Sequence, residues 1–347
     1  MSSPSERIMP LEFEKPVLAI ESKIDELVVM SRDANQNGLE IDFDAEIERL
    51  RQQASVLRQK TYDRLTPAQR LQIARHPQRP NFTDFIKLLS PQTWFELHGD
   101  RQGYDDRALL GGIAELEDES GHKRPVMFVG QQKGHGMKEN LTHNFGMANP
   151  EGYRKAMRLF AHADKFNMPI ITMIDTPGAY PGMHGEQHGI GFAIAHNIRE
   201  MARLGVPIIS VVTGEGSSGG ALGIGVANKI IMLSNAVYTV ISPEGCASIL
   251  WRTADYAATA AEAMKITAQD CLRFGIADAV VSEPLGGAHY DPQAMAASLK
   301  AELLAQLAAL EAMSAETLRN QRYDKYRAIG AFEEDSTPSK KPTLLSV

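Results

Sequence analysis

The residues most able to do chemistry lie in a glycine-rich stretch at positions 207–226, PIISVVTGEGSSGGALGIGV. Residues 207–212 are apolar and β-branched, which predicts a buried strand. Residues 213–220 predict a glycine-rich turn, and the small apolar residues from Ala221 onward favour a helix packed closely on that strand. Such a strand–turn–helix unit directs backbone N–H groups and the positive end of a helix at one spot. We therefore expect a negatively charged group to bind there.

Two interpretations of this stretch invoke a nucleotide or a serine nucleophile. Gly214, Gly216 and Gly219 match the G-x-G-x-x-G pattern of dinucleotide-binding turns, but the acidic residue expected about 20 positions later is missing. Ser218 lies at the centre of a G-x-S-x-G pattern, which is typical of a nucleophile elbow followed later by an acid and a histidine. The later residues that fit that order are Asp270, Asp278 and His289.

A third interpretation requires only the backbone. The N–H groups of Gly219 and Gly220 would form half of an oxyanion hole, which stabilises negative charge on a reacting oxygen. Glycine at both positions would let a substrate approach the backbone closely. A tight turn with a purely structural role also fits. The stretch alone leaves these alternatives open, and the elements around it have to decide among them.

The composition is typical of a globular protein with a large core, since 43% of the 347 residues are hydrophobic. The formal net charge of −7 argues against general binding to nucleic acids or membrane surfaces, because phosphate contacts require Lys and Arg. Residues 1–15 lack the apolar segment of a signal peptide, and no stretch of about 18 apolar residues occurs. We expect a cytoplasmic protein that binds neither nucleic acid nor membrane.

The sequence shows no pattern typical of a metal site. Cys246 and Cys271 are too few for a zinc site made of cysteines, and both are expected to be reduced and structural. His184, His188 and His196 lie near one another in the sequence without a recognised zinc spacing. We therefore expect no metal in this chain.

From Trp94 onward the pattern alternates between strands and helices, which predicts an α/β fold with a mainly parallel sheet. Ligands of such sheets bind beyond the carboxyl ends of the strands. The loop DTPGAYPG at 175–182 and the glycine-rich turn both follow buried strands, so we expect them to be neighbours in one site. The expected strands are 111–116, 125–130, 169–174, 207–212, 230–233 and 237–241, and the expected helices are 151–166, 185–204 and 292–311.

The N-terminal part has a different pattern. Apolar residues at helical spacing predict two amphipathic helices, 16–30 and 44–64, joined by a loop. Thr66 followed by Pro67 is typical of the start of a further short helix. We expect a helical N-terminal region at 1–90 without chemistry of its own, a main domain at 91–326 and a disordered tail at 327–347.

Long sequence motifs connect the chain to a known family. It resembles the α subunits of the bacterial and plastid acetyl-CoA carboxylase carboxyltransferase, which belong to the crotonase/ClpP superfamily. The similarity runs in the family's order from about residue 15 to 326. The matching motifs are ARHPQRP at 74–80, PEGYRKAMRL at 150–159, PIITMIDTPGAYPG at 169–182, GEGSSGGAL at 214–222, ISPEGCASILW at 241–251 and EPLGGAH at 283–289.

The resemblance implies a crotonase/ClpP-like spiral domain preceded by the helical N-terminal region. It also implies an enzyme that moves the carboxyl group of carboxybiotin to acetyl-CoA, giving malonyl-CoA for fatty acid synthesis. The family works as an α2β2 assembly, in which the β subunit carries a zinc ribbon and the CoA-facing half of the site. The biotin is borne by a separate partner, the biotin carboxyl carrier protein.

The resemblance also indicates which groups would act. The cofactor supplies the base in this reaction, so the protein has to position the reactants and stabilise oxygen anions, and no catalytic side chain is required. The backbone N–H groups of Gly219, Gly220, Gly178 and Ala179 would hold the biotin oxyanion. One such donor is worth about 3–4 kcal/mol of transition-state stabilisation. This implication disfavours Ser218 as a nucleophile.

Four side chains near the two loops complete the expected substrate-binding set. Lys133 and Lys138 lie in a loop after a strand, where they would reach a CoA phosphate or the biotin carboxyl group. Glu186 would cap or orient the helix after the DTPGAYPG loop, and Tyr180 lies within that loop. A solvent-exposed loop lysine without any specific role is the plainer interpretation of Lys133 and Lys138.

The chain departs from the family pattern beside the expected site. The family usually has His at Gln131, Arg at His135, Gln at Ile190 and basic residues within 140–143. Several positive charges are therefore missing, while the glycines remain. Three roles fit these changes: the ordinary subunit of fatty acid synthesis, a paralogue that serves another acyl-CoA, and an assembly partner with weak catalysis.

Overall fold

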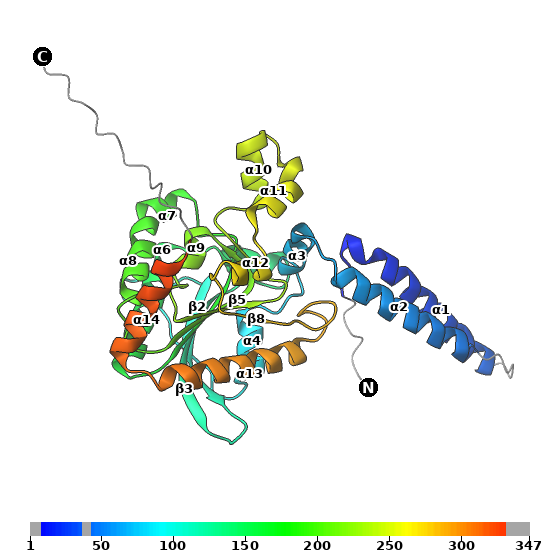
Figure 1. The fold of residues 1–347 in the computed structure, drawn as a ribbon, viewed down its shortest axis with the longest axis horizontal. Helices are drawn as coiled ribbons and strands as arrows, with labels where there is room; N and C mark the ends of the chain where they lie inside the picture. The colour runs from blue at the N-terminus through cyan, green and yellow to red at the C-terminus, as the bar shows by residue number, and fades with distance from the viewer. Residues whose placement is uncertain (1–7, 37–42, 331–347) are drawn as a thin grey trace, which may run out of the picture.

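A mixed eight-stranded sheet forms the centre of the chain, in the order β1-β2-β3-β4-β5-β6-β8, with β7 paired to β5 (Figure 1). The computed structural model describes residues 8–36 and 43–330. The first three strands pair antiparallel, and the remaining pairs are parallel, as predicted for most of the sheet. The strands are β1 Phe95–Glu96, β2 Leu109–Glu117, β3 Lys123–Gln131, β4 Ile170–Thr176, β5 Ile208–Ser217, β6 Lys229–Leu233, β7 Val237–Thr239 and β8 Ala279–Val281.

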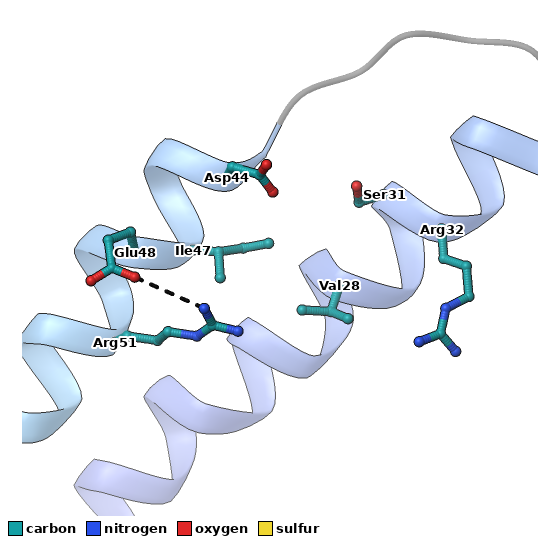
Figure 2. Close-up of a pocket in the computed structure, with 7 residues that line it drawn as sticks. All are labelled: Val28, Ser31, Arg32, Asp44, Ile47, Glu48 and Arg51. Carbon is teal, nitrogen blue, oxygen red and sulfur yellow. Dashed lines mark ion pairs between the residues drawn. The ribbon is translucent and has the colours of Figure 1, made fainter.

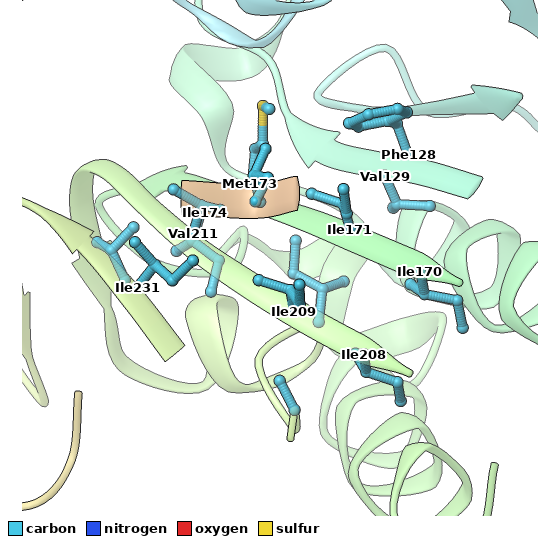
Figure 3. Packing of buried hydrophobic residues seen from close by; sticks show 14 of the residues in the cluster. Phe128, Val129, Ile170, Ile171, Met173, Ile174, Ile208, Ile209, Val211 and Ile231 are labelled. Atoms are coloured by element: carbon cyan, nitrogen blue, oxygen red, sulfur yellow. The ribbon is translucent and has the colours of Figure 1, made fainter. Parts of the chain in front are cut away.

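Strands β4 and β5 form the buried centre of this sheet. Every residue of both strands is buried, which explains their continuous runs of β-branched and other apolar residues. Figure 3 shows isoleucine, valine and methionine side chains of these strands packed with Phe128 and Val129 of β3 and Ile231 of β6. Thr172 and Ser210 are buried polar exceptions that hydrogen-bond to each other across the two strands, 2.7 Å apart.

Helices cover the sheet and close its ends. Helix α6 (Pro150–Lys165) packs on β2, β3 and α8 (Ile190–Met201), whereas α13 (Pro292–Glu311) packs on β5, β8 and α4 (Phe82–Leu89). Helix α14 (Ala315–Ala328) is anchored by the fully buried Arg322. The other helices are α3 Pro67–Ala74, α5 Met137–Thr142, α7 Met183–Gln187, α9 Ser218–Leu222, α10 Pro243–Trp251, α11 Ala257–Met264 and α12 Ala268–Arg273, with 3-10 turns η1 Glu12–Glu14, η2 Asn144–Gly146 and η3 Ala254–Tyr256.

The N-terminal helices α1 (Lys15–Gln36) and α2 (Asp44–Tyr62) form a hairpin that projects from the main body (Figure 1). Ile24, Ile47 and Leu50 form a small core of their own between the two helices. The Tyr62 hydroxyl at the base of the hairpin lies 2.6 Å from Glu14 Oε1 and 3.0 Å from the Gly286 carbonyl oxygen. These contacts fasten the hairpin to the loop before α13.

A hollow of about 870 Å³ lies between the two hairpin helices (Figure 2). It lies far along the hairpin from the sheet, and its lining residues offer no arrangement suited to catalysis. They are Val28, Ser31, Arg32, Asp44, Ile47, Glu48 and Arg51. We therefore look for the site at the sheet. No helix in the described part of the chain combines the length and the apolar character needed to cross a bilayer.

The structure corrects several sequence-based boundaries. Strand β5 continues through most of the predicted turn at 213–220, because Glu215, Gly216 and Ser217 pair in parallel with β7. The strand predicted at 237–241 ends at Thr239, whose hydroxyl accepts from the Ile241 N–H (3.2 Å). Tertiary pairing thus extended one strand, and a local side-chain bond shortened the other.

The helix boundaries also differ from the predicted ones. The helix predicted at 185–204 is two helices, α7 and α8, because Gly189 adopts a left-handed conformation with φ of 77°. Helix α1 runs to Gln36, beyond the predicted end at residue 30. Helix α14 continues to Ala328, and residues 331–347 of the expected tail lie outside the described residues.

We expect the Ile209→Ala substitution to lower the free energy of unfolding by about 2–5 kcal/mol, because it leaves a cavity in the fully buried centre of β5. Urea denaturation of the isolated chain would measure the change. Ile249→Ala removes the same atoms from a side chain that is 72% exposed, so its effect should stay within about 0.5 kcal/mol. Equal effects of the two substitutions would contradict the burial described here.

Candidate active site

Two loops meet where β4 and β5 end, as expected from the sequence. The two strands are paired in parallel up to Thr176 and Gly216, so the segments that follow them start side by side. A Cβ atom at Gly220 would lie 2.5 Å from the Ala179 nitrogen and 2.5 Å from the Gly178 carbonyl carbon. No side chain fits at Gly220, because the two backbones are in contact there.

The backbone amides at this junction differ in their availability. The Gly219 and Gly220 N–H groups belong to the first turn of α9, where a helix offers them no internal acceptor. The Gly178 N–H donates to Thr176 Oγ1 within its own loop (3.1 Å). The Ala179 N–H has no acceptor within the described residues, so it is the donor that this loop leaves open.

Gln131 at the end of β3 connects both loops. Its Nε2 donates to the Gly220 carbonyl oxygen (3.0 Å), and its Oε1 accepts from the Asp175 N–H (3.2 Å). The Tyr153 hydroxyl on α6 donates to the same Gly220 oxygen (3.1 Å). These bonds fix the peptide plane that follows Gly220. Gln131 is almost fully buried, and the sequence alone identifies it only as a departure from the family pattern.

Lys133 lies beside the junction as an ion pair with Asp175. The Lys133 Nζ is 2.6 Å from Asp175 Oδ1, which also accepts from the Glu215 N–H (2.9 Å). A Cβ at Gly214 would lie only 2.5 Å from that carboxylate oxygen, so Asp175 packs directly under the second loop. The expected loop lysine is thus fixed in place, with its charge compensated by Asp175.

A pocket of about 260 Å³ opens next to this ion pair. Arg75 and Arg79 reach it from the segment after α3, and both arginines are held by buried carboxylates. Arg75 binds both oxygens of Glu215, at 3.1 and 2.6 Å, and Arg79 binds both oxygens of Glu283, at 2.9 and 2.7 Å. The pocket is lined by Ala74, Arg75, His76, Pro77, Arg79, Asn81, Lys133, Gly134, Asn140, Phe145, Asp175 and Pro177.

The buried pair of Arg79 and Glu283 organises the floor of this region. Burial opposes the ionisation of Glu283, but the Arg79 guanidinium holds the pKa of that carboxyl below its ordinary value. Arg79 also donates to the Thr213 carbonyl oxygen (2.8 Å), which ties the pair to β5. In the sequence, Arg75 and Arg79 were only part of a family motif, because their partners lie more than a hundred residues away.

The other expected side chains lie around the junction rather than in it. Lys138 is exposed on α5, and Glu186 is exposed on α7. Tyr180 is half-buried, and its ring folds back over Gly182, where a Cβ would lie 2.4 Å from the Tyr180 hydroxyl. Lys133 alone of these four side chains lines the pocket described above.

The structure does not assemble a serine triad. Ser218 is exposed with a φ of 57°, and within residues 8–36 and 43–330 its hydroxyl has no hydrogen bond to an acid or a histidine. His289 is buried against His76, with ring centroids 3.9 Å apart. Asp270 caps a helix, and Asp278 pairs with two lysines. The nucleophile-elbow interpretation therefore lacks its acid and its base.

His135 supplies a positive charge near the pocket. Its Nε2 lies 2.7 Å from Asp84 Oδ2, and its Nδ1 lies 3.0 Å from the Pro77 carbonyl oxygen. The hydrogen bond to Asp84 raises the pKa of His135 to about 9, although partial burial acts against the shift. His135 is consequently a cation at neutral pH and keeps the charge of the arginine that the family usually has at this position.

The mixed sheet with its covering helices defines a class, the crotonase-like α/β fold. Solved structures share the fold at low sequence identity. The transcarboxylase 12S structure with methylmalonyl-coenzyme A bound is 20% identical, with a TM-score of 0.53 over 67% of this chain and 42% of that chain. A Pseudomonas malonate decarboxylase hetero-tetramer is 18% identical, with a TM-score of 0.54 over 69% and 90%.

Sequence comparisons give the family. The acetyl co-enzyme A carboxylase carboxyltransferase-like family matches residues 10–330, and this chain belongs to it. The curated acetyl-coenzyme A carboxylase carboxyl transferase subunit alpha of Synechococcus elongatus is 52% identical over 94% of this chain and 96% of that relative. The subunit alpha of a Synechocystis species is 49% identical over 96% of this chain and 99% of that relative. The resemblance inferred from the motifs is confirmed.

We expect the His135 imidazole to titrate near pH 9 in the folded chain and, in the Asp84→Asn variant, near its ordinary value of about 6.5. NMR of the chain with isotope-labelled histidines would measure both pKa values, and a His135→Gln variant would identify the signal. Since the folded-state pKa is raised, the pair stabilises the fold fully below about pH 6.5 and loses that effect as the pH rises through about 9. Titration of His135 near 6.5 in the unchanged chain would disprove the pairing with Asp84.

Proposed function

We propose that this chain is the α subunit of an acetyl-CoA carboxylase carboxyltransferase. In this reaction the carboxyl group of carboxybiotin moves to acetyl-CoA and gives malonyl-CoA, the first step of fatty acid synthesis. Identity near 50% with curated α subunits over almost the whole of both chains supports this function. The structural observation that carries it is the cluster of open amides formed where Gly220 meets Ala179.

The residues at the junction fit a biotin oxyanion. When bound, carboxybiotin supplies the carboxyl group and the basic atom for proton removal. The Gly219, Gly220 and Ala179 N–H groups donate to the oxygen on which negative charge develops. A Cβ at Gly178 would meet nothing within 4 Å, so a ligand can approach that loop. Gln131 and Tyr153 hold the peptide that follows Gly220, which supports the turn that carries the Gly219 and Gly220 N–H groups.

The expected side chains have distinct proposed roles in substrate binding. Lys133 is held by Asp175 at the edge of the pocket, where it is placed to meet a carboxyl group. Lys138 is exposed, so it is available to a CoA phosphate at little cost in desolvation. Tyr180 lies on the loop of Ala179, and Glu186 lies on α7 directly after it; both would border the bound substrate.

The proposed enzyme includes further proteins. The curated relatives are named as one subunit, alpha, of a carboxyl transferase. We infer a β subunit that carries zinc, an α2β2 assembly and a biotin carboxyl carrier protein as the donor of the carboxyl group. We place the assembly in the cytoplasm, because fatty acid synthesis takes its acetyl-CoA there. The alternatives are a paralogue that acts on another acyl-CoA and an assembly partner with weak catalysis.

We expect this chain, co-expressed with a β subunit of the family, to catalyse biotin-dependent decarboxylation of malonyl-CoA, the reverse partial reaction. The activity should vanish when either subunit is left out, because each contributes one half of the site. Turnover of purified complexes with acetyl-, propionyl- and longer acyl-CoAs in the forward reaction would be measured in parallel. Preference for another acyl group would favour the paralogue, and a stable complex without turnover would favour the assembly partner.

We expect the Gly220→Ala substitution to lower kcat about 10²–10³-fold, because the added methyl group would separate the two loops and displace their amides. The assay of the two-subunit complex would measure kcat, and circular dichroism would monitor the fold. Gly191→Ala is a matched control, because a Cβ at this exposed position of α8 would meet nothing within 4 Å. Equal activity of the two variants would contradict the role given to the junction.

Ser218→Ala separates this mechanism from a serine hydrolase in the same assay. The substitution keeps all backbone N–H groups, so at least about half of the activity should remain within the ±0.5 kcal/mol expected of such a surface change. Complete loss of activity with an intact fold, together with indifference to biotin, would instead support a hydrolase that uses Ser218.

A further inference from the structure

Three potential metal ligands from separate parts of the chain converge beside the first loop. Glu151 lies at the start of α6, and His184 and His188 lie on α7 and directly after it. One ligand atom of each residue lies within 4.8 Å of the other two. His188 Nδ1 is 2.5 Å from Glu151 Oε1, and His184 Nε2 is 3.6 Å from the same oxygen. His196, the third histidine near in sequence, instead packs against Phe192 on α8.

These spacings suit a tetrahedral metal site. With metal–ligand bonds of about 2.0–2.1 Å, ligand atoms in a tetrahedral zinc site lie roughly 3.3 Å from one another. The two histidine nitrogens lie 2.5 and 3.6 Å from Glu151 Oε1, on either side of that value, and all three ligand atoms lie within 4.8 Å of one another. Side-chain rotations would bring them to one ion. Two imidazoles and one carboxylate prefer ions of the zinc type, whereas calcium and magnesium prefer oxygen ligands alone.

The Glu151 carboxylate provides a second, independent observation. Glu151 is only 3% exposed, and its Oε2 has no hydrogen-bond partner within the described residues. A buried carboxylate oxygen without a partner is costly, and a bound cation would satisfy it. Arg154 Nη2 lies 3.2 Å from Oε1, the other oxygen of the same group. The two histidines approach Oε1 as well, so an ion bound by both carboxylate oxygens would satisfy Oε2 and leave Arg154 on Oε1 as an outer partner.

An ordinary ion pair explains less of this arrangement. The hydrogen bond between Glu151 and His188, together with Arg154, would account for a structural pair. It would not account for His184, whose ring centroid lies 3.9 Å from that of His188 and whose nitrogen lies too far from Glu151 for a hydrogen bond. A metal ion bridges such distances without a change in the backbone.

We propose that Glu151, His184 and His188 form a binding site for a divalent transition metal of the zinc type. Sequence spacing alone predicted no metal, because Glu151 comes from a different helix than the two histidines. The ion would fasten α7 to α6 and so hold the segment between β4 and α7, which carries Ala179 and Tyr180. The three protein ligands leave a fourth position for water. This site does not depend on the proposed carboxyltransferase function.

Zinc binding to the untagged full-length chain tests the proposal. Competition against a chromophoric chelator should give one tightly bound zinc ion per chain, and cobalt should give the absorption of a tetrahedral site. His184→Ala and His188→Ala should each weaken zinc binding at least about tenfold. Zinc should also raise the melting temperature of the unchanged chain but not that of His188→Ala, whereas magnesium should have no effect.

His196→Ala is the matched control, because it removes a nearby half-buried histidine that lies outside the cluster. It should bind zinc as the unchanged chain does. The two histidine variants change side chains that are at least partly exposed, so they test the site even if Glu151→Gln fails to fold. Equal zinc affinity in the unchanged chain and the His184→Ala/His188→Ala double variant would overturn the proposal and leave a structural ion pair only.

Discussion

The contact between the backbones at Gly220 and Ala179 is the constraint on which the site depends. Two parallel strands deliver their loops to the same edge of the sheet, and the absence of a side chain at Gly220 lets these loops touch. The touching loops bring the backbones of two different segments into contact, which is the arrangement that the proposed oxyanion site requires. The buried Gln131 and Tyr153 hold the Gly220 carbonyl oxygen, so the peptide directly after the contact is fixed in orientation.

Charge around this contact is balanced by paired groups. Lys133 is paired with Asp175, Arg75 with Glu215 and Arg79 with Glu283. A buried charge without a partner would be costly. Two of the pairs also bond to the backbone of β5, because Asp175 accepts from the Glu215 N–H and Arg79 donates to the Thr213 carbonyl oxygen. The ion pairs therefore chiefly stabilise the positions of the loops. A substrate therefore contacts a surface on which the side-chain charges are largely neutralised and the N–H donors are fixed. Such a surface suits a reaction in which negative charge develops only in the transition state.

Local patterns predicted the central strands and the two glycine loops, because β-branched runs and glycine clusters have strong local preferences. They also predicted that the loops would be neighbours, since parallel strands end at one edge. The pairing that extended β5 through Ser217 and the break at Gly189 depend on distant contacts or on one backbone angle. The roles of Gln131 and Arg79 were hidden for the same reason, because their partners lie far away in the sequence.

The proposed site of backbone amides would also explain how its surroundings can vary. An N–H group is supplied by any residue, so function restricts the chain mainly where a side chain would block the contact, as at Gly220. Side chains around the two loops need only preserve the local charge or hold the loops in position. His135 shows this, because Asp84 keeps it protonated and thus equivalent in charge to an arginine. Departures from the family pattern near the site are therefore compatible with an unchanged reaction, provided that the contact at Gly220 and the ion pairs that stabilise the loops remain.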